Sequence, residues 1–301
     1  MIEIVFLGTS SMMPTKERNH SAVFMRENKL SVLFDCGEGT QRQLRIAQIK
    51  PSKINIILLS HWHGDHVLGL SGLLQTIAAS VEYKEDKKIT IIGPKGTRAR
   101  IGFMMKAFSF QDPITLEIID VSNDGVCYEN DNVFIEAHLL KHSVPCLGFS
   151  FNVKDKISIN KRKLDLFGIK EGPILKKLKN SENITVNGTM YDYHDLTNVK
   201  KGKKIGYAVD TRPCNGLVSI AKDCNLLIAE ATYADKQKDK AYENFHMTGS
   251  EVATIASQNN VDKLVITHFS QRYKSADEIL SEARVIFPET RAAYDFMKIR
   301  L

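Results

Sequence analysis

The chain has 301 residues, of which 43% are hydrophobic and 25% are charged, and these proportions are ordinary for a globular protein. They argue against wholesale disorder, and no apolar run approaches the roughly 20 residues that a membrane-spanning helix needs. Residues 1–10 contain Glu3 but no basic residue, so we expect no secretory signal. The five cysteines form no Cys-x-x-Cys pair, which indicates a reducing, cytoplasmic setting.

Short apolar runs between turn residues predict strands, and apolar residues at helical spacing predict helices. The predicted strands lie within 2–7, 21–34, 54–59, 88–92, 132–140, 147–153, 204–209, 225–228 and 263–267. The predicted helices are 67–79, 97–107, 249–258 and 276–285, the last followed by a short tail. Strands that alternate with helices predict an α/β chain with mixed sheets.

Two segments repeat one pattern, an apolar strand followed by a hydroxyl residue and a histidine. They are residues 57–61 and residues 264–268. Five residues do not exclude coincidence. A fold of two similar halves, whose strand ends face one central site, would produce the same pattern.

Residues 154–179 carry nine basic and three acidic side chains, so their excess of +6 equals the net charge of the whole chain. A run of lysines is usually a solvated face. This one interrupts the strand pattern and contains Gly168, Gly172 and Pro173, which indicates an arm with a small packed tip. The apolar residues available to pack that tip are Leu164, Leu166, Phe167, Ile169, Ile174 and Leu175.

The sequence His61-Trp62-His63-Gly64-Asp65-His66 places four potential metal ligands directly between a predicted strand and a predicted helix. Imidazole and carboxylate groups suit zinc and similar divalent ions. A polar surface loop is the alternative. Only nine histidines occur in the chain, and three of them fall within these six residues, so we favour a metal site.

Further ligands are expected at other strand ends, because site residues commonly sit on loops held by a rigid sheet. His142, Asp210 and His268 each follow a predicted strand. Taken singly, each is more often a surface or hydrogen-bonded residue than a ligand. Their order after the first cluster favours the ligand interpretation.

That order resembles the metallo-β-lactamase superfamily, whose motif His-x-His-x-Asp-His is followed by single histidine and aspartate ligands. The resemblance implies an αββα sandwich and two Zn²⁺ ions per subunit. It implies one ion held by His61, His63 and His142, a second held by Asp65, His66 and His268, and Asp210 as the bridge. Such a pair lowers the pKa of a shared water and stabilises transition-state charge, and Asp65 would both ligate and orient the hydroxide.

Further segments resemble, in order, motifs of the ribonuclease Z family of tRNA 3′-processing endoribonucleases. They are residues 14–19, 34–41, 230–232 and 246–248. The resemblance implies that His246, oriented by Glu230, protonates the leaving 3′ oxygen. Taken alone, His246 is better explained as a residue near the start of the helix 249–258, but the order of the motifs favours a catalytic role. The family usually has a histidine where this chain has Ala229, so no role is expected there.

The same resemblance implies a cytoplasmic homodimer that cuts precursor tRNA, with one domain over 1–301 and a flexible tRNA-binding arm inserted at 154–200. Arg18 and Asn19 are either part of a solvated turn or help to place the RNA. An arm this basic would bind phosphates without reading sequence. The expected RNA contacts there are Lys161, Arg162, Lys163, Gly172, Pro173, Lys176 and Lys177.

Two other functions stay open at this point. Another phosphodiesterase of the superfamily, acting on a small or cyclic substrate, would keep the metals but would have no use for the arm. A non-catalytic RNA-binding metalloprotein would have a closed structural zinc site, without spare groups such as Glu230 and His246.

Overall fold

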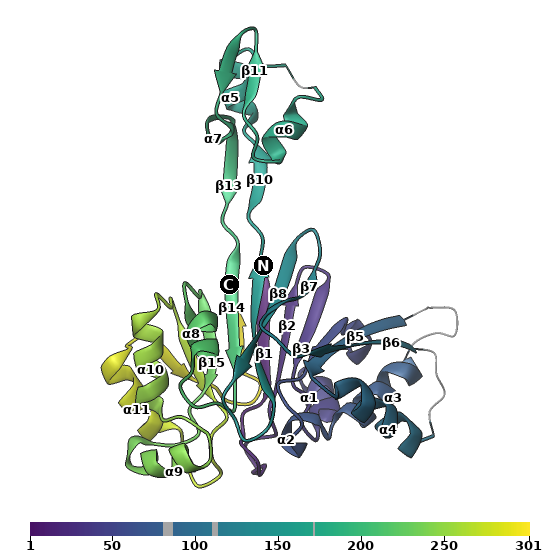
Figure 1. Cartoon of the computed structure of the whole chain (residues 1–301), viewed down its shortest axis with the longest axis vertical. Coiled ribbons are helices and arrows are strands. Elements are labelled where there is room, and N and C mark those ends of the chain that lie inside the picture. The colour runs from purple at the N-terminus through teal and green to yellow at the C-terminus, as the bar shows by residue number, and fades with distance from the viewer. Residues whose placement is uncertain (81–86, 110–113, 171) are drawn as a thin grey trace. The chain divides into compact units, whose positions relative to one another are not determined.

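The computed structural model describes residues 1–80, 87–109, 114–170 and 172–301. The chain divides into two compact units. The first contains Met1–Tyr128, Ile135–Phe151 and Lys204–Leu301, and the second contains Glu129–Phe134 and Asn152–Lys203. Figure 1 shows the elements of both units.

Two seven-stranded sheets make up most of the first unit, and the first of them has the order β18-β1-β2-β3-β4-β5-β6. Its strands are β1 (Ile2–Gly8), β2 (Ala22–Glu27), β3 (Leu30–Phe34), β4 (Ile56–Leu58), β5 (Lys87–Pro94), β6 (Ile114–Val121) and β18 (Lys298–Arg300). The pairs from β18 to β3 are antiparallel, and those from β3 to β6 are parallel. The helices of this half are α1 (Thr40–Ile46), α2 (Gly64–Val67), α3 (Leu70–Ser80) and α4 (Thr97–Ala107).

The second sheet has the order β17-β16-β15-β14-β9-β8-β7. Its strands are β7 (Gly125–Glu129), β8 (Val133–Leu140), β9 (Cys146–Val153), β14 (Lys203–Ala208), β15 (Leu226–Glu230), β16 (Leu264–Thr267) and β17 (Thr290–Ala292). The strands β14 to β17 run parallel. The helices of this half are α8 (Asn215–Ala221), α9 (Lys238–Glu243), α10 (Gly249–Gln258) and α11 (Asp277–Ile286).

The central strands of both sheets, such as β3, β4, β15 and β16, are buried on both faces, which gives the first unit four layers. In β3, Leu33 packs in one apolar cluster with Leu44 of α1 and Leu70 of α3. The next residue, Phe34, points to the other face and contacts the ring of Tyr207 from β14, with ring centroids 4.9 Å apart. Helices therefore cover the outer face of each sheet while the inner faces meet (Figure 1), and the predicted αββα sandwich is confirmed.

The chain's last residues differ from the prediction of a short tail. They form β17 and β18, and β18 pairs with β1 at the edge of the first sheet. Strands of three residues are too short to show an alternating pattern in the sequence, so they were not predicted. Within the described residues no helix is long and apolar enough to cross a membrane.

The second unit has its own small core. It contains α5 (Lys161–Leu166), α6 (Leu175–Lys179), α7 (Tyr193–Leu196) and two antiparallel strand pairs. The pairs are β10 (Lys156–Ile159) with β13 (Thr197–Lys200), and the hairpin of β11 (Ile184–Val186) with β12 (Thr189–Tyr191). The buried core residues are Leu164, Ile169, Leu178, Ile184 and Leu196. Leu166, which the sequence suggested for this packing, is instead 79% exposed. Glu171, counted in the charge of the basic segment, lies outside the described residues.

Candidate metal centre

The candidate site lies where strands of both sheets end. Asp35 follows β3, and His61 to His66 follow β4 on the first sheet. On the second sheet, Asp210 follows β14, Glu230 ends β15 and His268 follows β16. Asp35, Asp210 and His268 adopt left-handed backbone conformations, with φ of 55°, 54° and 61°. Such values are uncommon outside glycine and recur at functional sites, and here they turn the chain directly after the strand.

Residues 36–37 pack closely against the loop that contains the histidine cluster. A Cβ atom on Gly37 would lie 2.3 Å from the carbonyl oxygen of Asp65, so only glycine allows this approach. The amide of Cys36 donates to the carbonyl of His66 at 2.8 Å. The segment 34–41, whose motif the sequence singled out, thus holds the loop that carries Asp65 and His66.

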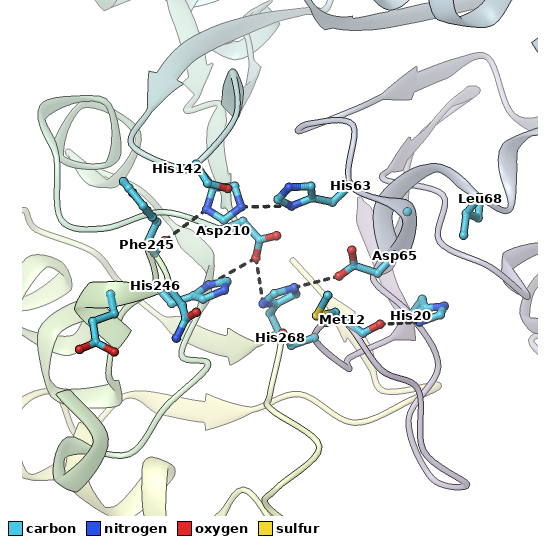
Figure 2. Close-up of a pocket in the computed structure, with 15 residues that line it drawn as sticks. Met12, His20, His63, Asp65, Leu68, His142, Asp210, Phe245, His246 and His268 are labelled. Carbon is cyan, nitrogen blue, oxygen red and sulfur yellow. Dashed lines mark hydrogen bonds and ion pairs between the residues drawn. The ribbon is translucent and has the colours of Figure 1, made fainter. Parts of the chain in front are cut away.

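The first group of potential ligands is His61, His63, His142 and Asp210, whose candidate ligand atoms all lie within 4.8 Å of one another. His142 Nε2 is 3.3 Å from His63 Nδ1, and His61 Nε2 is 3.1 Å from Asp210 Oδ2. His142 reaches this group because the backbone of Lys141 pairs with that of Arg212, two residues after Asp210. Figure 2 shows the rings of His63 and His142 next to each other in the wall of the pocket, joined by this contact.

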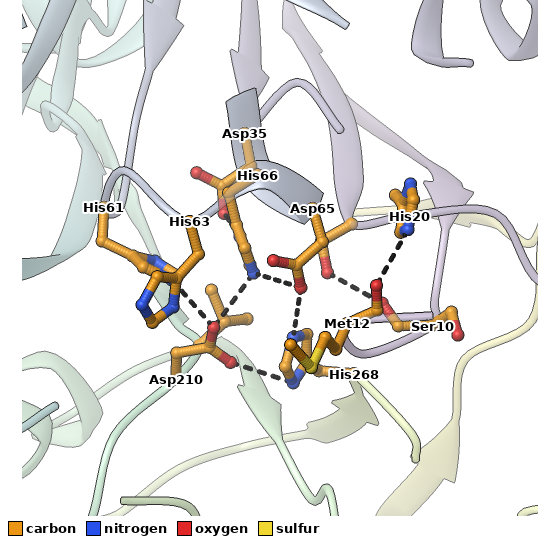
Figure 3. A network of polar contacts seen from close by, with 12 residues as sticks. Ser10, Met12, His20, Asp35, His61, His63, Asp65, His66, Asp210 and His268 are labelled. Carbon is orange, nitrogen blue, oxygen red and sulfur yellow. Dashed lines mark hydrogen bonds and ion pairs between the residues drawn. The ribbon is translucent and has the colours of Figure 1, made fainter. Parts of the chain in front are cut away.

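The second group is Asp65, His66, Asp210 and His268, again with candidate ligand atoms within 4.8 Å. Asp210 Oδ2 is 3.0 Å from His66 Nε2, and Asp210 Oδ1 is 2.9 Å from His268 Nδ1. Asp65 Oδ2 is 3.2 Å from His66 Nε2 (Figure 3). Asp210 therefore belongs to both groups, the arrangement expected of a bridging ligand.

Four buried polar atoms at this centre have no partner in hydrogen-bonding geometry among the described residues, although three of them lie 2.9–3.1 Å from a neighbouring ligand atom. They are His61 Nε2, His66 Nε2, Asp210 Oδ1 and His268 Nε2. Buried polar groups are nearly always satisfied, so a set of unsatisfied atoms that converge on one space calls for a missing partner. Nitrogen and oxygen donors of this kind fit divalent metal ions. The residues present therefore fit a metal centre.

Hydrogen bonds on the far side of the rings orient the histidines. His66 Nδ1 donates to Asp35 Oδ2 at 2.8 Å, and His142 Nδ1 lies 3.3 Å from the carbonyl oxygen of Phe245. Asp35 also accepts from the Ser60 amide and from the hydroxyl of Tyr207, so both sheets hold this carboxylate. Such outer partners fix which ring nitrogen faces a metal. Asp35 was not among the site residues predicted from the sequence. Its position at a strand end, within the motif of residues 34–41, was the available signal.

At this centre, burial and the neighbouring charges shift the pKa values of the buried groups in opposite directions. Burial disfavours the charged form of Asp210, but His268 and His66 outweigh it and hold the pKa of Asp210 well below its ordinary value. Burial likewise opposes protonation of His268, yet Asp210 raises the pKa of His268 to about 10. For His142, burial dominates and lowers the pKa to about 4. The buried carboxylates thus stay negative and require positive charge beside them, which protons or metal ions can supply.

Glu230 and His246 form a separate pair beside the centre. His246 Nδ1 donates to Glu230 Oε1 at 3.0 Å, while Oε1 also accepts the Thr211 amide at 2.6 Å and Oε2 the Met247 amide at 3.1 Å. Burial disfavours a charged His246, but the Glu230 carboxylate outweighs it and raises the pKa of His246. Glu230, His246 and His268 form a third group of potential metal ligands. The carboxylate oxygens of Glu230, however, already accept the two backbone amides, so we assign this group no metal ion.

A cavity of about 510 Å³ opens onto both groups and onto His246 (Figure 2). Arg18 and Asn19 do not line this cavity among the described residues. Instead, Arg18 Nη1 donates to the carbonyl oxygen of Tyr273 at 2.8 Å, and Asn19 Nδ2 donates to that of Glu38 at 2.7 Å. The other expected RNA contacts, from Lys161 to Lys177, belong to the second unit.

Two facing sheets with helices outside, and a histidine–aspartate centre at their shared edge, define a protein of the metallo-β-lactamase fold. The chain is 36% identical to ribonuclease Z of Bacillus mycoides (strain KBAB4), over 98% of this chain and 97% of the relative. It is 35% identical to ribonuclease Z of Methanothermobacter thermautotrophicus, over 100% of this chain and 97% of the relative. The chain belongs to the ribonuclease Z family.

Two further comparisons are consistent with this assignment. The crystal structure of the short form of human tRNase Z (ELAC1) aligns with a TM-score of 0.71 and 28% identity, covering 99% of this chain and 98% of that one. Residues 2–102 also match the family described as Anti-Pycsar protein Apyc1. That match covers less than half of the chain, so the family assignment depends on the full-length relatives.

Proposed function

We propose that this protein is a zinc-dependent endoribonuclease that removes the 3′ trailer of precursor tRNA and leaves a 3′-hydroxyl on the tRNA. One observation carries the proposal. Two groups of buried ligand atoms share Asp210 and lie beside a hydrogen-bonded His246–Glu230 pair in the same cavity. A purely structural metal site would not need a histidine–carboxylate pair next to it. Membership of the ribonuclease Z family supports the substrate.

Each residue of the metal centre has a separate role in this proposal. His61, His63 and His142 would hold one zinc ion, and Asp65, His66 and His268 a second, with Asp210 between them. Bound there, the two ions supply a water of lowered pKa and stabilise charge on the phosphate oxygens. Asp65 would orient the attacking oxygen. His246 would hold a proton at Nε2 for the leaving 3′ oxygen, because Glu230 accepts the hydrogen bond of Nδ1.

The second unit would bind the body of the tRNA. Arg162, Lys163, Lys176 and Lys177 are exposed, and none forms an ion pair with the carboxylates that the structure describes. Basic side chains without a carboxylate partner can bind the phosphates of RNA, because this releases the counterions that surround the RNA. The proposal includes a homodimer, as the family resemblance implies. It also includes a cytoplasmic setting, which the five free cysteines support.

Metal removal tests the activity directly. Incubated with end-labelled precursor tRNA, the protein is expected to cut once, next to the acceptor stem, and to release a tRNA whose 3′ end is oxidised by periodate. A chelator should abolish cleavage, and added zinc should restore it. A product that ends in a cyclic phosphate, or cleavage that survives a chelator, would contradict the proposal, because water activated by metals leaves a free hydroxyl.

Deletion of residues 154–200, replaced by a short glycine–serine linker, tests the role of the second unit. We expect cleavage of precursor tRNA to fall steeply, while hydrolysis of bis(p-nitrophenyl) phosphate stays at the rate of the intact chain, since that small diester needs only the metal centre. Both rates are followed in steady-state assays, and metal content serves as the control for folding. Equal loss on both substrates would show that the segment does not act through tRNA.

A further inference from the structure

A second cleft lies apart from the metal cavity, on the loop that follows His268. Its volume is about 510 Å³, and it is lined by Lys236, Gln237, Arg272, Tyr273, Lys274, Ser275 and Glu278. Three of these side chains are basic and one is acidic. Glu278 pairs with Lys236 at 2.7 Å, which leaves Arg272 and Lys274 as the uncompensated charges.

Arg272 is held in place by neutral groups. Its Nη1 donates to Gln237 Oε1 at 2.8 Å, its Nε donates to Ser270 Oγ at 3.2 Å, and its Cζ lies 5.1 Å from the centre of the Tyr233 ring. Within the described part of the chain it forms no ion pair, and its Nη2 makes no hydrogen bond. An exposed arginine that is fixed without a carboxylate presents its charge to a ligand, and a guanidinium matches the oxygens of a phosphate.

This cleft is adjacent to the proposed proton donor. Arg272 packs over the ring of Tyr233. The centre of this ring lies 5.9 Å from the centre of the His246 ring. The backbone gives a second connection, because Ser270 donates its amide to the carbonyl of Thr232, next to Tyr233. Only one aromatic ring therefore separates the guanidinium from the group proposed to protonate the leaving oxygen.

The cleft also adjoins Arg18, for which the sequence left open a solvated turn or a role in placing the RNA. The carbonyl of Tyr273 accepts from Arg18 Nη1 at 2.8 Å, and its hydroxyl accepts from the Ala234 amide at 2.9 Å. Arg18 in turn lies over the ring of Phe269, with 5.1 Å between Cζ and the ring centre. Tyr273 thus links the loop of Arg18 to the cleft of Arg272.

We propose that the Arg272 cleft binds the phosphodiester backbone of single-stranded RNA next to the bond that is cut, with Arg272 as the anchoring cation and Lys274 as a second contact. This proposal adds an RNA-binding subsite to the proposed function. It rests on that function, which identifies the bound strand as part of precursor tRNA. The cleft offers charge and no pattern of base-edge partners, so it would hold the strand in place without reading its sequence.

The test compares Arg272→Gln, Arg272→Lys and the control Arg291→Gln, which removes the same charge from an exposed position on β17. We expect Arg272→Gln to raise KM for precursor tRNA about tenfold, the loss of one charge-assisted contact. The slope of log KM against log salt should fall by about 0.7, as for one phosphate on a single strand. Arg272→Lys should keep that salt slope, and all variants should hydrolyse bis(p-nitrophenyl) phosphate at the wild-type rate.

Binding of a labelled single-stranded RNA, followed by fluorescence anisotropy with the metal-loaded protein, separates this proposal from the one on which it rests. If the wild type does not cut precursor tRNA but Arg272→Gln weakens RNA binding relative to Arg291→Gln, the proposed function fails and the subsite stands. If the wild type cuts and Arg272→Gln matches Arg291→Gln in KM, salt slope and anisotropy, the subsite is wrong.

Discussion

Asp210→Asn is expected to abolish cleavage and to strip metal from the protein. The two carboxylate oxygens of Asp210 face His61, His66 and His268 at 2.9–3.1 Å, and the residue belongs to both candidate ligand groups. An amide in its place would present N–H groups to ring nitrogens and would remove the negative charge that the two proposed ions would share. The loss should exceed the roughly 10- to 100-fold cost of losing an outer partner of a metal ligand.

Asp223→Asn is the matched control for this substitution. Asp223 also has a left-handed backbone, with φ of 53°, but it is exposed and outside the centre. Asparagine tolerates this conformation, so neither substitution should strain the chain. Metal per chain, measured by elemental mass spectrometry, and the rate on precursor tRNA are the readouts. Wild-type metal content and rate in Asp210→Asn would refute the bridging assignment.

His246→Ala is expected to lower kcat on precursor tRNA by about 10²- to 10⁴-fold, the usual contribution of a general acid, with metal content unchanged. The 3′ oxygen of RNA is a poor leaving group and needs a proton. p-Nitrophenolate leaves without one, so hydrolysis of bis(p-nitrophenyl) phosphate should be nearly unaffected. Replacing His246 is a cleaner test than replacing Glu230, because Glu230 also holds the amides of Thr211 and Met247.

His138→Ala serves as the control for His246→Ala. His138 is a half-buried histidine on β8 that contacts Ser150, and it lies outside every candidate ligand group that the described residues form. The control should keep the wild-type rate on both substrates. If His246→Ala reduces the rates on RNA and on the nitrophenyl ester equally, His246 acts through the metal centre and not as an acid.

The sequence was informative where local patterns decide the outcome. The helices 97–107 and 249–258 were predicted with the bounds that the structure shows, because Gly96 precedes the first and Thr248 and Asn259 delimit the second. The αββα fold, in contrast, came from the order of His61, His142, Asp210 and His268, since no local pattern states which strands pair. The structure brings those four side chains together from four strand ends of two sheets.

Other features of the site could not be predicted, because they depend on tertiary contacts. The Asp35 carboxylate that orients His66 also accepts a hydrogen bond from Tyr207, 172 positions away along the chain. Arg18 was expected near the RNA, but nothing local indicates that it binds the carbonyl of Tyr273. The left-handed backbone at His268 is likewise set by the surrounding fold, since histidine adopts it uncommonly.

The separate core of the second unit has an evolutionary consequence. Leu164, Leu178 and Leu196 pack with one another and belong to an apolar cluster distinct from those of the two sheets. Substitutions on the lysine-rich surface of that unit can therefore accumulate without disturbing the residues that perform hydrolysis. On the role proposed for this unit, selection can adjust the binding of RNA independently of its cleavage, so relatives that share one chemistry are free to diverge in their choice of target.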